Sequence, residues 1–186
     1  DETALLAVQR LVAAARKYGK RVHVLHVSSA IEMEFLATAK DVATVETLPQ
    51  FLTFAGPQIY ERLHGFAQMN PPIRYPQDLA ALWSIGILQG VVDVLGTDHA
   101  PHTREEKAQP YPKSPSGMPG VQTLVPVMLT HVNEGRLSLQ RFVDLTSAGP
   151  NRVFGIEGKG RIALGYDADF TLVDLKAKRI IRNEDQ

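Results

Sequence analysis

The chain of 186 residues contains no cysteine. Disulfide bonds and thiolate metal ligands are therefore excluded, so any metal ion must be bound by histidine and carboxylate side chains. There is also no excess charge of either sign, because 20 basic residues balance 20 acidic ones. Nucleic acid is therefore not expected as a partner. No apolar run approaches the roughly 18 residues that span a bilayer, so no membrane partner is expected either.

The residues that are present have the proportions of a soluble globular protein, with 44% apolar and 22% charged residues. The length is sufficient for one ordinary domain with a substantial core. Together with the lack of cysteine, this composition favours an intracellular protein, and we expect it to be cytoplasmic.

Hydrophobic periodicity predicts helices that alternate with short apolar strands over the first 150 residues. An amphipathic helix is expected over 3–18, where Gly19 is placed to end it. The expected strands are 21–27, 42–48 and 91–96, and the further expected helices are 30–39, 57–63, 76–90, 121–134 and 138–147, with an extended piece at 66–69. This alternation is typical of βαβ units and a parallel sheet.

The pattern changes at about residue 150. Glycine residues separate three further predicted strands, at 161–163, 169–174 and 178–182, which is typical of a separate small β unit. The three or four βα units before them are too few to close an eight-stranded barrel. We therefore expect the chain to be part of a longer protein.

The run GTDHAPH, residues 96–102, is the strongest candidate for a functional site. It places Asp98 at the carboxyl end of a buried strand, where α/β barrels carry their catalytic groups. An aspartate there can bind a divalent metal ion and take a proton from its bound water, or it can cap a helix or pair with Arg104. His26 lies near the carboxyl end of an earlier strand, although a lone histidine is most often a hydrogen-bonded core residue.

These residues belong to a longer resemblance to a known family. Residues 96–107, GTDHAPHTREEK, resemble the signature of the class I dihydroorotases, which are members of the amidohydrolase superfamily. Residues 23–29 resemble the sixth-strand motif of that family. Residues 67–74, AQMNPPIR, and 114–122, SPSGMPGVQ, resemble two segments that contact a pyrimidine ring. Residues 150–174 resemble the return of the chain to a composite β-sandwich.

The resemblance implies an α/β fold with two parts. Residues 1–150 would form the C-terminal half of a TIM-type (β/α)8 barrel, with strands 6–8 and their flanking helices, and residues 151–186 would begin a small β-sandwich domain. It also implies an enzyme with one or two zinc ions. That enzyme reversibly converts L-dihydroorotate to N-carbamoyl-L-aspartate in de novo pyrimidine biosynthesis.

The resemblance assigns roles to individual residues. His26 and Asp98 are implied as zinc ligands, and Asp98 also as the catalytic base that passes a proton from the attacking water to the ring nitrogen. The residues implied to bind the substrate are Asn70, His102, Ser116 and Gly117. Of these, His102 would hold the substrate carboxylate.

The chain also departs from the family pattern. The remaining metal ligands of the family, including a His-x-His pair, lie N-terminal to the sixth strand and are absent here. We therefore expect the isolated chain to be inactive, since a complete zinc site has three or more protein ligands. Gln50 stands where many relatives have histidine, which is expected to change the site without removing a ligand.

Two alternatives stay open. The protein could be a sister cyclic amidase, such as a hydantoinase or an allantoinase, although His102 and the segment around Asn70 argue against this. It could instead be a non-catalytic dihydroorotase-like subunit that supports an aspartate transcarbamoylase, although such subunits typically lose residues of the kind that survive here as His26 and Asp98. A small-molecule substrate and further copies of the same chain are the other partners we expect.

Overall fold

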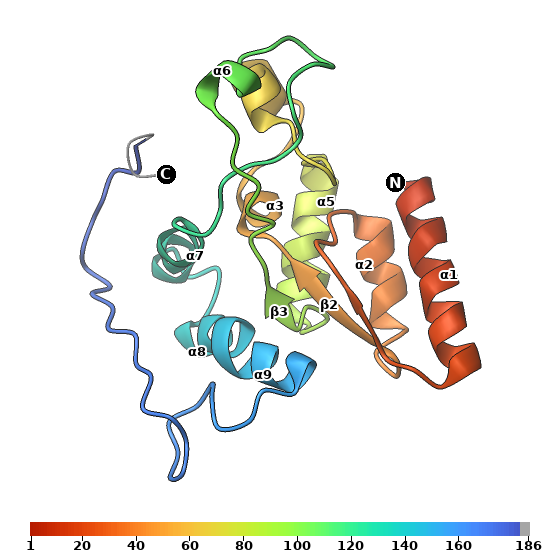
Figure 1. Ribbon diagram of the computed structural model, residues 1–186, viewed down its shortest axis with the longest axis vertical. Coiled ribbons are helices and arrows are strands. Elements are labelled where there is room, and N and C mark those ends of the chain that lie inside the picture. Colours follow the sequence, from red (N-terminus) through yellow and green to blue (C-terminus); the bar gives the residue numbers. More distant parts are fainter. Residues whose placement is uncertain (183–186) are drawn as a thin grey trace.

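A three-stranded parallel sheet lies at the centre of the computed structural model, which describes residues 1–182 (Figure 1). The strands are β1 (Val22–Val24), β2 (Ala43–Thr47) and β3 (Val94–Leu95), in the spatial order β1-β2-β3. Val22 pairs with Ala43, and Glu46 pairs with Val94. The predicted α/β fold with a parallel sheet is thus confirmed.

Helices alternate with these strands along the chain. They are α1 (Glu2–Tyr18), α2 (Ala30–Ala37), α3 (Pro49–Thr53), α4 (Gln58–Leu63), the 3-10 helix η1 (His64–Ala67), α5 (Pro76–Ala81), the π-helical turns η2 (Leu82–Leu88), α6 (Arg104–Lys107), α7 (Leu124–Asn133), α8 (Leu139–Val143), the π-helical turns η3 (Asp144–Ala148) and α9 (Gly149–Phe154). None of the helices in residues 1–182 is long and apolar enough to cross a membrane.

Local sequence explains where the first helices begin and end. Gly19 adopts φ +59° after α1, and its N–H reaches back to the carbonyl oxygens of Ala15 and Arg16. A left-handed residue is least strained as glycine, so α1 ends where the sequence predicts. Helix α2 starts after Ser29, whose hydroxyl accepts a hydrogen bond from the Glu32 N–H.

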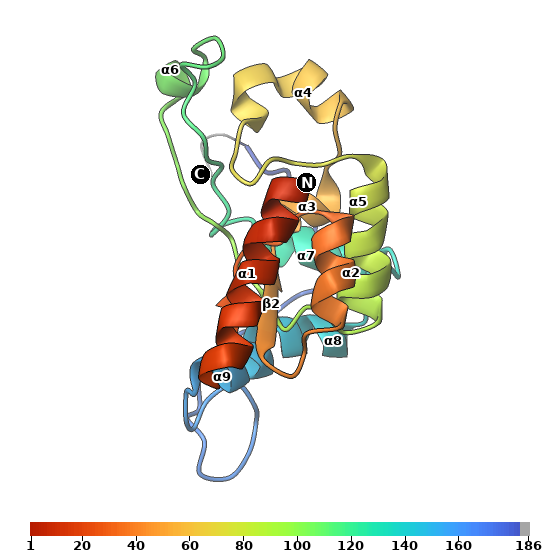
Figure 2. The same cartoon turned by 90° about the vertical axis from the view of Figure 1, so that its right-hand side faces the viewer.

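The hydrophobic core lies between the sheet and its helices. Helices α1, α2 and α5 lie side by side (Figure 2). They bury apolar side chains such as Val12, Met33 and Leu36, which belong to the same cluster as Val45 of β2. Burial of this apolar surface stabilises the fold by about 25 cal/mol per Å². The core therefore fixes the sheet, and the sheet fixes the loops at its carboxyl edge.

Several expected elements differ from the structure. Residues 66–69 were expected to be extended, but η1 includes Phe66 and Ala67 and is closed by the Gln68 N–H, which donates to the Gly65 carbonyl oxygen; Gln68 itself is extended. The loop expected from 97 to 120 contains α6, whose capping box joins Thr103 and Glu106. The long helix expected over 76–90 is divided into α5 and η2.

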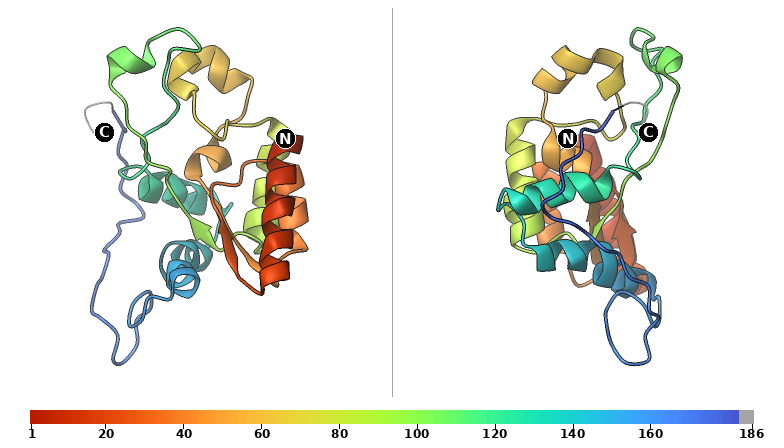
Figure 3. Two further views of the ribbon diagram at one scale, coloured as in Figure 1. Left: turned by 45° about the vertical axis from the view of Figure 1, so that its right-hand side comes forward. Right: turned by 90° about the vertical axis from the view of Figure 1, so that its left-hand side faces the viewer.

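The strands expected at 161–163, 169–174 and 178–182 do not form. Residues 161–182 are exposed and irregular, and they run along the outside of the molecule (Figure 3). A strand needs a neighbouring strand to satisfy its N–H and C=O groups, and within residues 1–182 the sheet consists of β1, β2 and β3 alone. The expectation of strands in this part of the chain was therefore wrong for residues 161–182.

Candidate active site at the carboxyl ends of the strands

Both predicted metal ligands lie at the carboxyl edge of the sheet. His26 follows β1 and Asp98 follows β3, and parallel strands bring these ends to one edge. Helices α4 and α6 lie at the same end of the molecule, above this edge in Figure 2. The sequence prediction of a polar strand-end site is thus compatible with the topology.

The backbone at both residues is strained. His26 has φ +39° and Asp98 has φ +44°, and they are two of the three non-glycine residues with positive φ in residues 1–182. Residues other than glycine rarely adopt a positive φ. A residue held in this conformation costs on the order of 1–3 kcal/mol of stability, and such residues are found most often at functional sites. The strain therefore supports a role for this pair beyond packing.

Glu46 of β2 holds the turn that carries His26. Its carboxylate oxygen Oε1 accepts a hydrogen bond from the His26 N–H at 3.3 Å, and its carbonyl oxygen accepts one from the Val27 N–H at 2.9 Å. The next residue, Thr47, donates its hydroxyl to the Val27 carbonyl oxygen at 2.8 Å. The end of β2 therefore fixes the path of the chain after β1.

The end of β2 also fixes the turn that carries Asp98. The Gly96 N–H donates to the Thr47 carbonyl oxygen at 3.1 Å, and the Gln50 side-chain amide donates to the Thr97 carbonyl oxygen at 3.1 Å. The Glu46 carboxylate lies so close to Gly96 that a Cβ there would lie 2.5 and 2.7 Å from its two oxygens. A Cβ at this position would therefore require the Glu46 carboxylate to move.

The two candidate ligands suit zinc by their chemistry but not by their number. An imidazole nitrogen and a carboxylate oxygen are both common zinc ligands. Within residues 1–182, however, no group of three or more histidine, aspartate or glutamate side chains is arranged to hold a metal ion. His99 does not add a ligand, since its Nδ1 accepts hydrogen bonds from the Gly120 and Val121 N–H groups. The described residues therefore offer two candidate ligands and no complete metal site.

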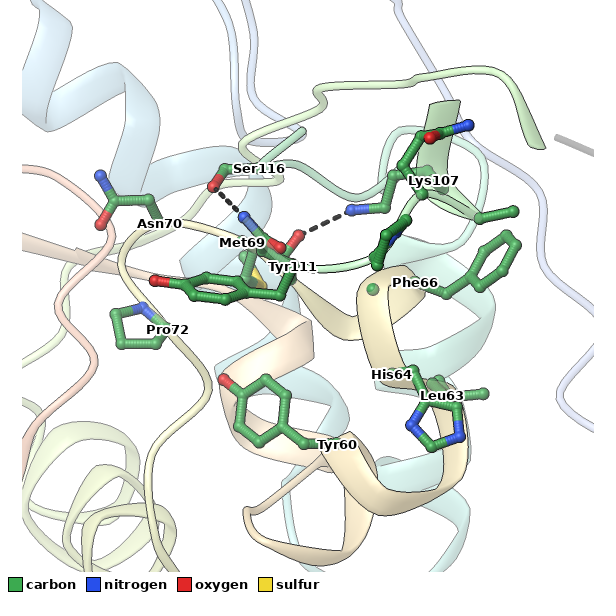
Figure 4. Close-up of a pocket in the computed structure, with 15 residues that line it drawn as sticks. Tyr60, Leu63, His64, Phe66, Met69, Asn70, Pro72, Lys107, Tyr111 and Ser116 are labelled. Atoms are coloured by element: carbon green, nitrogen blue, oxygen red, sulfur yellow. Dashed lines mark hydrogen bonds between the residues drawn. The ribbon is translucent and has the colours of Figure 1, made fainter. Parts of the chain in front are cut away.

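The predicted substrate-binding residues form a second group in the loops above the sheet. Asn70 and Ser116 line one cavity of about 840 Å³ between α4, η1 and the loop after α6 (Figure 4). The Gly117 N–H donates to the Gln68 carbonyl oxygen at 3.0 Å, and the Gln68 side chain donates to the Ser116 hydroxyl at 3.4 Å. The structure thus brings the segments of Asn70 and Gly117 together.

His102 lies beside the same loop. Its Nε2 is 3.1 Å from the Ser116 carbonyl oxygen, a contact that requires a proton on Nε2, and its Nδ1 is 3.8 Å from Oε2 of Glu106. A Cβ at Gly117 would lie 3.2 Å from the same imidazole nitrogen. Among the described residues, no hydrogen bond or ion pair joins this loop group to the side chains of His26 or Asp98.

Three residues of the site were missed by sequence reasoning, namely Glu46, Gln50 as a contact of the Asp98 turn, and Lys107. A signal existed for Glu46, because it is the one charged residue of β2. Lys107 belongs to the polar run after Asp98 and resembles an exposed loop residue by sequence alone. Its burial is apparent only from the structure.

The fold and the placement of these residues define an α/β protein whose candidate functional residues lie at the carboxyl ends of parallel strands. The chain belongs to the amidohydrolase family, which matches residues 74–185. This match agrees with the resemblance found in the sequence.

Curated relatives narrow this assignment. The dihydroorotase of Halobacterium salinarum is 41% identical over 184 residues, which cover 99% of this chain and 43% of that protein. The dihydroorotase of Methanosphaera stadtmanae is 38% identical over 174 residues, 92% of this chain and 39% of that protein. The chain therefore spans about two fifths of these relatives. The resemblance to dihydroorotases is confirmed.

Solved structures give the same fold. The L-hydantoinase (dihydropyrimidinase) from Arthrobacter aurescens superposes with a TM-score of 0.83 at 34% identity, over 89% of this chain and 38% of that one. The dihydropyrimidinase from Brevibacillus agri superposes with a TM-score of 0.77 at 28% identity. This chain therefore shares its α/β fold with cyclic amide hydrolases.

Proposed function

We propose that the full-length protein carrying this chain is a dihydroorotase. It would reversibly convert L-dihydroorotate to N-carbamoyl-L-aspartate in de novo pyrimidine biosynthesis. The observation that carries the proposal is Asp98, held in a strained turn at the carboxyl end of β3 within the GTDHAPH run. The identity to proteins named dihydroorotase over nearly the whole chain supports it.

His26 and Asp98 are the residues that would hold zinc, together with ligands from outside this chain. Bound zinc would polarise the amide carbonyl of the ring and make water more acidic. Asp98 would take the proton of the attacking water on a carboxylate oxygen and deliver it to the ring nitrogen as the amide bond breaks. The bonds from the β2 end keep the Asp98 turn in place during this transfer.

The loop group would bind the substrate. Asn70 and Ser116 would offer an amide and a hydroxyl to a pyrimidine ring in their common cavity. Gly117 would contact the ring beside Ser116, with its own N–H bonded to Gln68 and its carbonyl oxygen bonded to Lys107. His102, next to the Ser116 carbonyl oxygen, would donate to the substrate carboxylate. These proposed contacts support a carboxylated ring as the substrate class.

The proposal extends to the architecture. Residues 1–150 would be strands 6–8 and flanking helices of a (β/α)8 barrel, and residues 151–186 would start a composite β-sandwich. Exposed apolar side chains in residues 161–182 support the proposed β-sandwich, because they would be buried if further strands packed against them. They include Ile162, Leu164 and Leu172, which are 87, 102 and 97% exposed. A cytoplasmic homo-oligomer, with a transcarbamoylase as a further partner, remains a prediction.

A hydantoinase-type activity is the second candidate. It is favoured by the superposition on the L-hydantoinase from Arthrobacter aurescens at a TM-score of 0.83. The two candidates differ in the substrate carboxylate, which dihydroorotate has and hydantoin lacks. His102 is the residue in this chain that would recognise that group.

The test compares L-dihydroorotate, hydantoin and allantoin as substrates of the full-length protein. We expect kcat/KM for dihydroorotate to exceed the other two values by at least about 100-fold, because only dihydroorotate satisfies His102. Asp98→Asn should lower kcat by about 1,000-fold, since it removes a ligand and the proton acceptor. Asp174→Asn, an exposed carboxylate in the irregular segment, serves as the matched control. A preference for hydantoin would contradict the proposal.

A further inference from the structure

Lys107 is a buried lysine that lies beside the predicted substrate-binding residues, and its environment is unusual for a cation. It is the last residue of α6, and its residue surface is only 6% exposed. Within residues 1–182 it forms no ion pair with a carboxylate, and burial lowers the pKa of its ammonium group from the ordinary value. Lysine is rarely buried without a charged partner, so this position needs an explanation.

The explanation lies in three backbone carbonyl groups. Lys107 Nζ donates to the carbonyl oxygens of Gln68 at 2.8 Å, Pro115 at 2.8 Å and Gly117 at 2.9 Å. An ammonium group has three N–H donors, so each donor has one acceptor. A planar guanidinium has a different donor geometry and would not satisfy the same three oxygens from the same point.

These three oxygens belong to two segments that are far apart in sequence. Gln68 precedes Asn70 closely, while Pro115 and Gly117 are the neighbours of Ser116 on either side. Figure 4 shows the Lys107 side chain directed towards the side of the cavity where Met69 and Ser116 lie. The Gln68 side chain donates to the Ser116 hydroxyl on that side. The Gln68 carbonyl oxygen accepts two bonds, one from Lys107 and one from the Gly117 N–H at 3.0 Å.

We infer that Lys107 is a positioning residue that clamps the Asn70 segment to the Ser116–Gly117 loop and so shapes the substrate cavity. This inference rests on the proposed function, because the cavity is taken as the place of the substrate ring. Lys107 does not touch the reacting atoms in this assignment. It acts through the backbone of the residues that do contact the ring.

The consequence of losing the clamp is specific. Without the ammonium group three buried carbonyl oxygens lose a donor, while the Ser114 hydroxyl still ties the loop to the Gly65 carbonyl oxygen at 3.1 Å. The loop would stay attached but take up a broader range of positions. Contacts that hold the substrate equally in the ground and transition states would weaken, which raises KM and leaves kcat nearly unchanged.

The experiment uses Lys107→Met in the full-length protein, with Lys113→Met as a matched control on an exposed lysine of the same loop. We expect KM for L-dihydroorotate to rise about 10-fold with kcat within about threefold. Amide hydrogen exchange at Gly117, whose N–H is bonded to Gln68, should accelerate at least about 10-fold relative to the core strands. Lys113→Met should change neither quantity.

The two readouts separate the possible failures. Unchanged KM and unchanged Gly117 exchange overturn the inference, as does an exchange increase that is equal throughout the protein. If Lys107→Met cannot be purified, KM and Gly117 exchange are measured for Lys107→Gln, which keeps two N–H donors but lacks the ammonium group. Wild-type values of both quantities in Lys107→Gln also overturn the inference. If the wild-type protein does not act on dihydroorotate, the proposed function fails, while Gly117 exchange still decides whether the clamp exists.

Discussion

Glu46 connects the two strand ends that carry His26 and Asp98. Its carboxylate accepts the His26 N–H and fills the space beside Gly96, and its Oε2 lies 3.8 Å from the His23 imidazole. The Glu46 side chain of β2 thus contacts residues of both neighbouring strands, β1 and β3, or of the turns that follow them. The strain at the two candidate ligands is sustained by this contact and by the bonds of Thr47 and Gln50.

Replacing Gly96 by alanine tests this arrangement at the scale of one atom. The new Cβ would lie 2.5 and 2.7 Å from the Glu46 carboxylate oxygens, so the side chain must move. We expect Gly96→Ala to lower the free energy of unfolding by about 1–3 kcal/mol, as overpacking does. The free energy is measured by urea unfolding of the full-length protein.

Glu46→Ala supplies the control for this prediction. In the double variant the space is free, so the cost of Gly96→Ala should largely disappear, with a coupling energy above about 1 kcal/mol. Additive effects of the two substitutions would show that the close approach of Gly96 and Glu46 does not determine the cost.

Single residues were predictable from sequence to the extent that their role depends on the local chain. Asp98 was identified because it follows an apolar strand directly, and His26 because it follows another. Glu46 and Lys107 were not identified, since their roles depend on His26 and Gln68, which lie 20 and 39 residues away in the sequence. Periodicity gives the face of a strand but not the residue that will lie beside it.

At the scale of elements, an ionic cluster joins the last three helical segments to the sheet. Asp144 of η3 binds Arg141 of α8 and Arg152 of α9, each at 2.8 Å. Arg141 also donates to the Val92 carbonyl oxygen at 2.6 Å, just before β3. The hydrogen bond from Arg152, and then the positive charges of Arg152 and Arg141, hold the pKa of the Asp144 carboxyl below its ordinary value.

This cluster makes the stability depend on pH in a defined direction. The pKa of Asp144 is lower in the folded state than in the unfolded state, where it is about 4. The stabilisation of the fold by ionised Asp144 is therefore present above the unfolded pKa and is lost as pH falls through the folded pKa. Asp144→Asn should therefore lower the free energy of unfolding by about 1–2 kcal/mol at pH 7. Below the folded pKa the variant and the wild type should converge. Urea unfolding at several pH values measures this.

Asp41→Asn is the control for the cluster. Asp41 pairs with Arg16 at 2.8 Å, but both side chains are about half exposed, at 55% and 46%. An exposed pair contributes little because water and salt screen it. If Asp41→Asn and Asp144→Asn lower the free energy of unfolding equally, the ion pairs that link η3, α8 and α9 stabilise the fold no more than an exposed pair does.

Helices were more predictable than strands for a physical reason. The hydrogen bonds of a helix lie within the helix, so local periodicity predicted α1, α2 and α7 to within a few residues. A strand is completed by its neighbours, so β1 and β3 are shorter than their apolar runs. The segment 161–182 has an apolar pattern but does not join the sheet, whose described strands are β1, β2 and β3, and it is irregular.

At the scale of the whole molecule, the described part of the chain exposes sheet edges and apolar side chains. In the order β1-β2-β3, β1 and β3 each have one side without a partner strand among residues 1–182. Unpaired strand edges and exposed apolar side chains favour association with another chain segment. The chain also spans only about two fifths of its curated relatives.

The last prediction concerns the isolated chain of 186 residues. His26 and Asp98 are two candidate ligands, whereas a zinc site holds its ion with three or more. The purified chain should therefore hydrolyse L-dihydroorotate at less than about one thousandth of the rate of the full-length protein, with or without added zinc. Product formation by both proteins is measured at matched concentrations, with zinc binding followed by calorimetry. Turnover at the full-length rate would mean that residues of this chain complete the site, against the partial ligand set found at the strand ends.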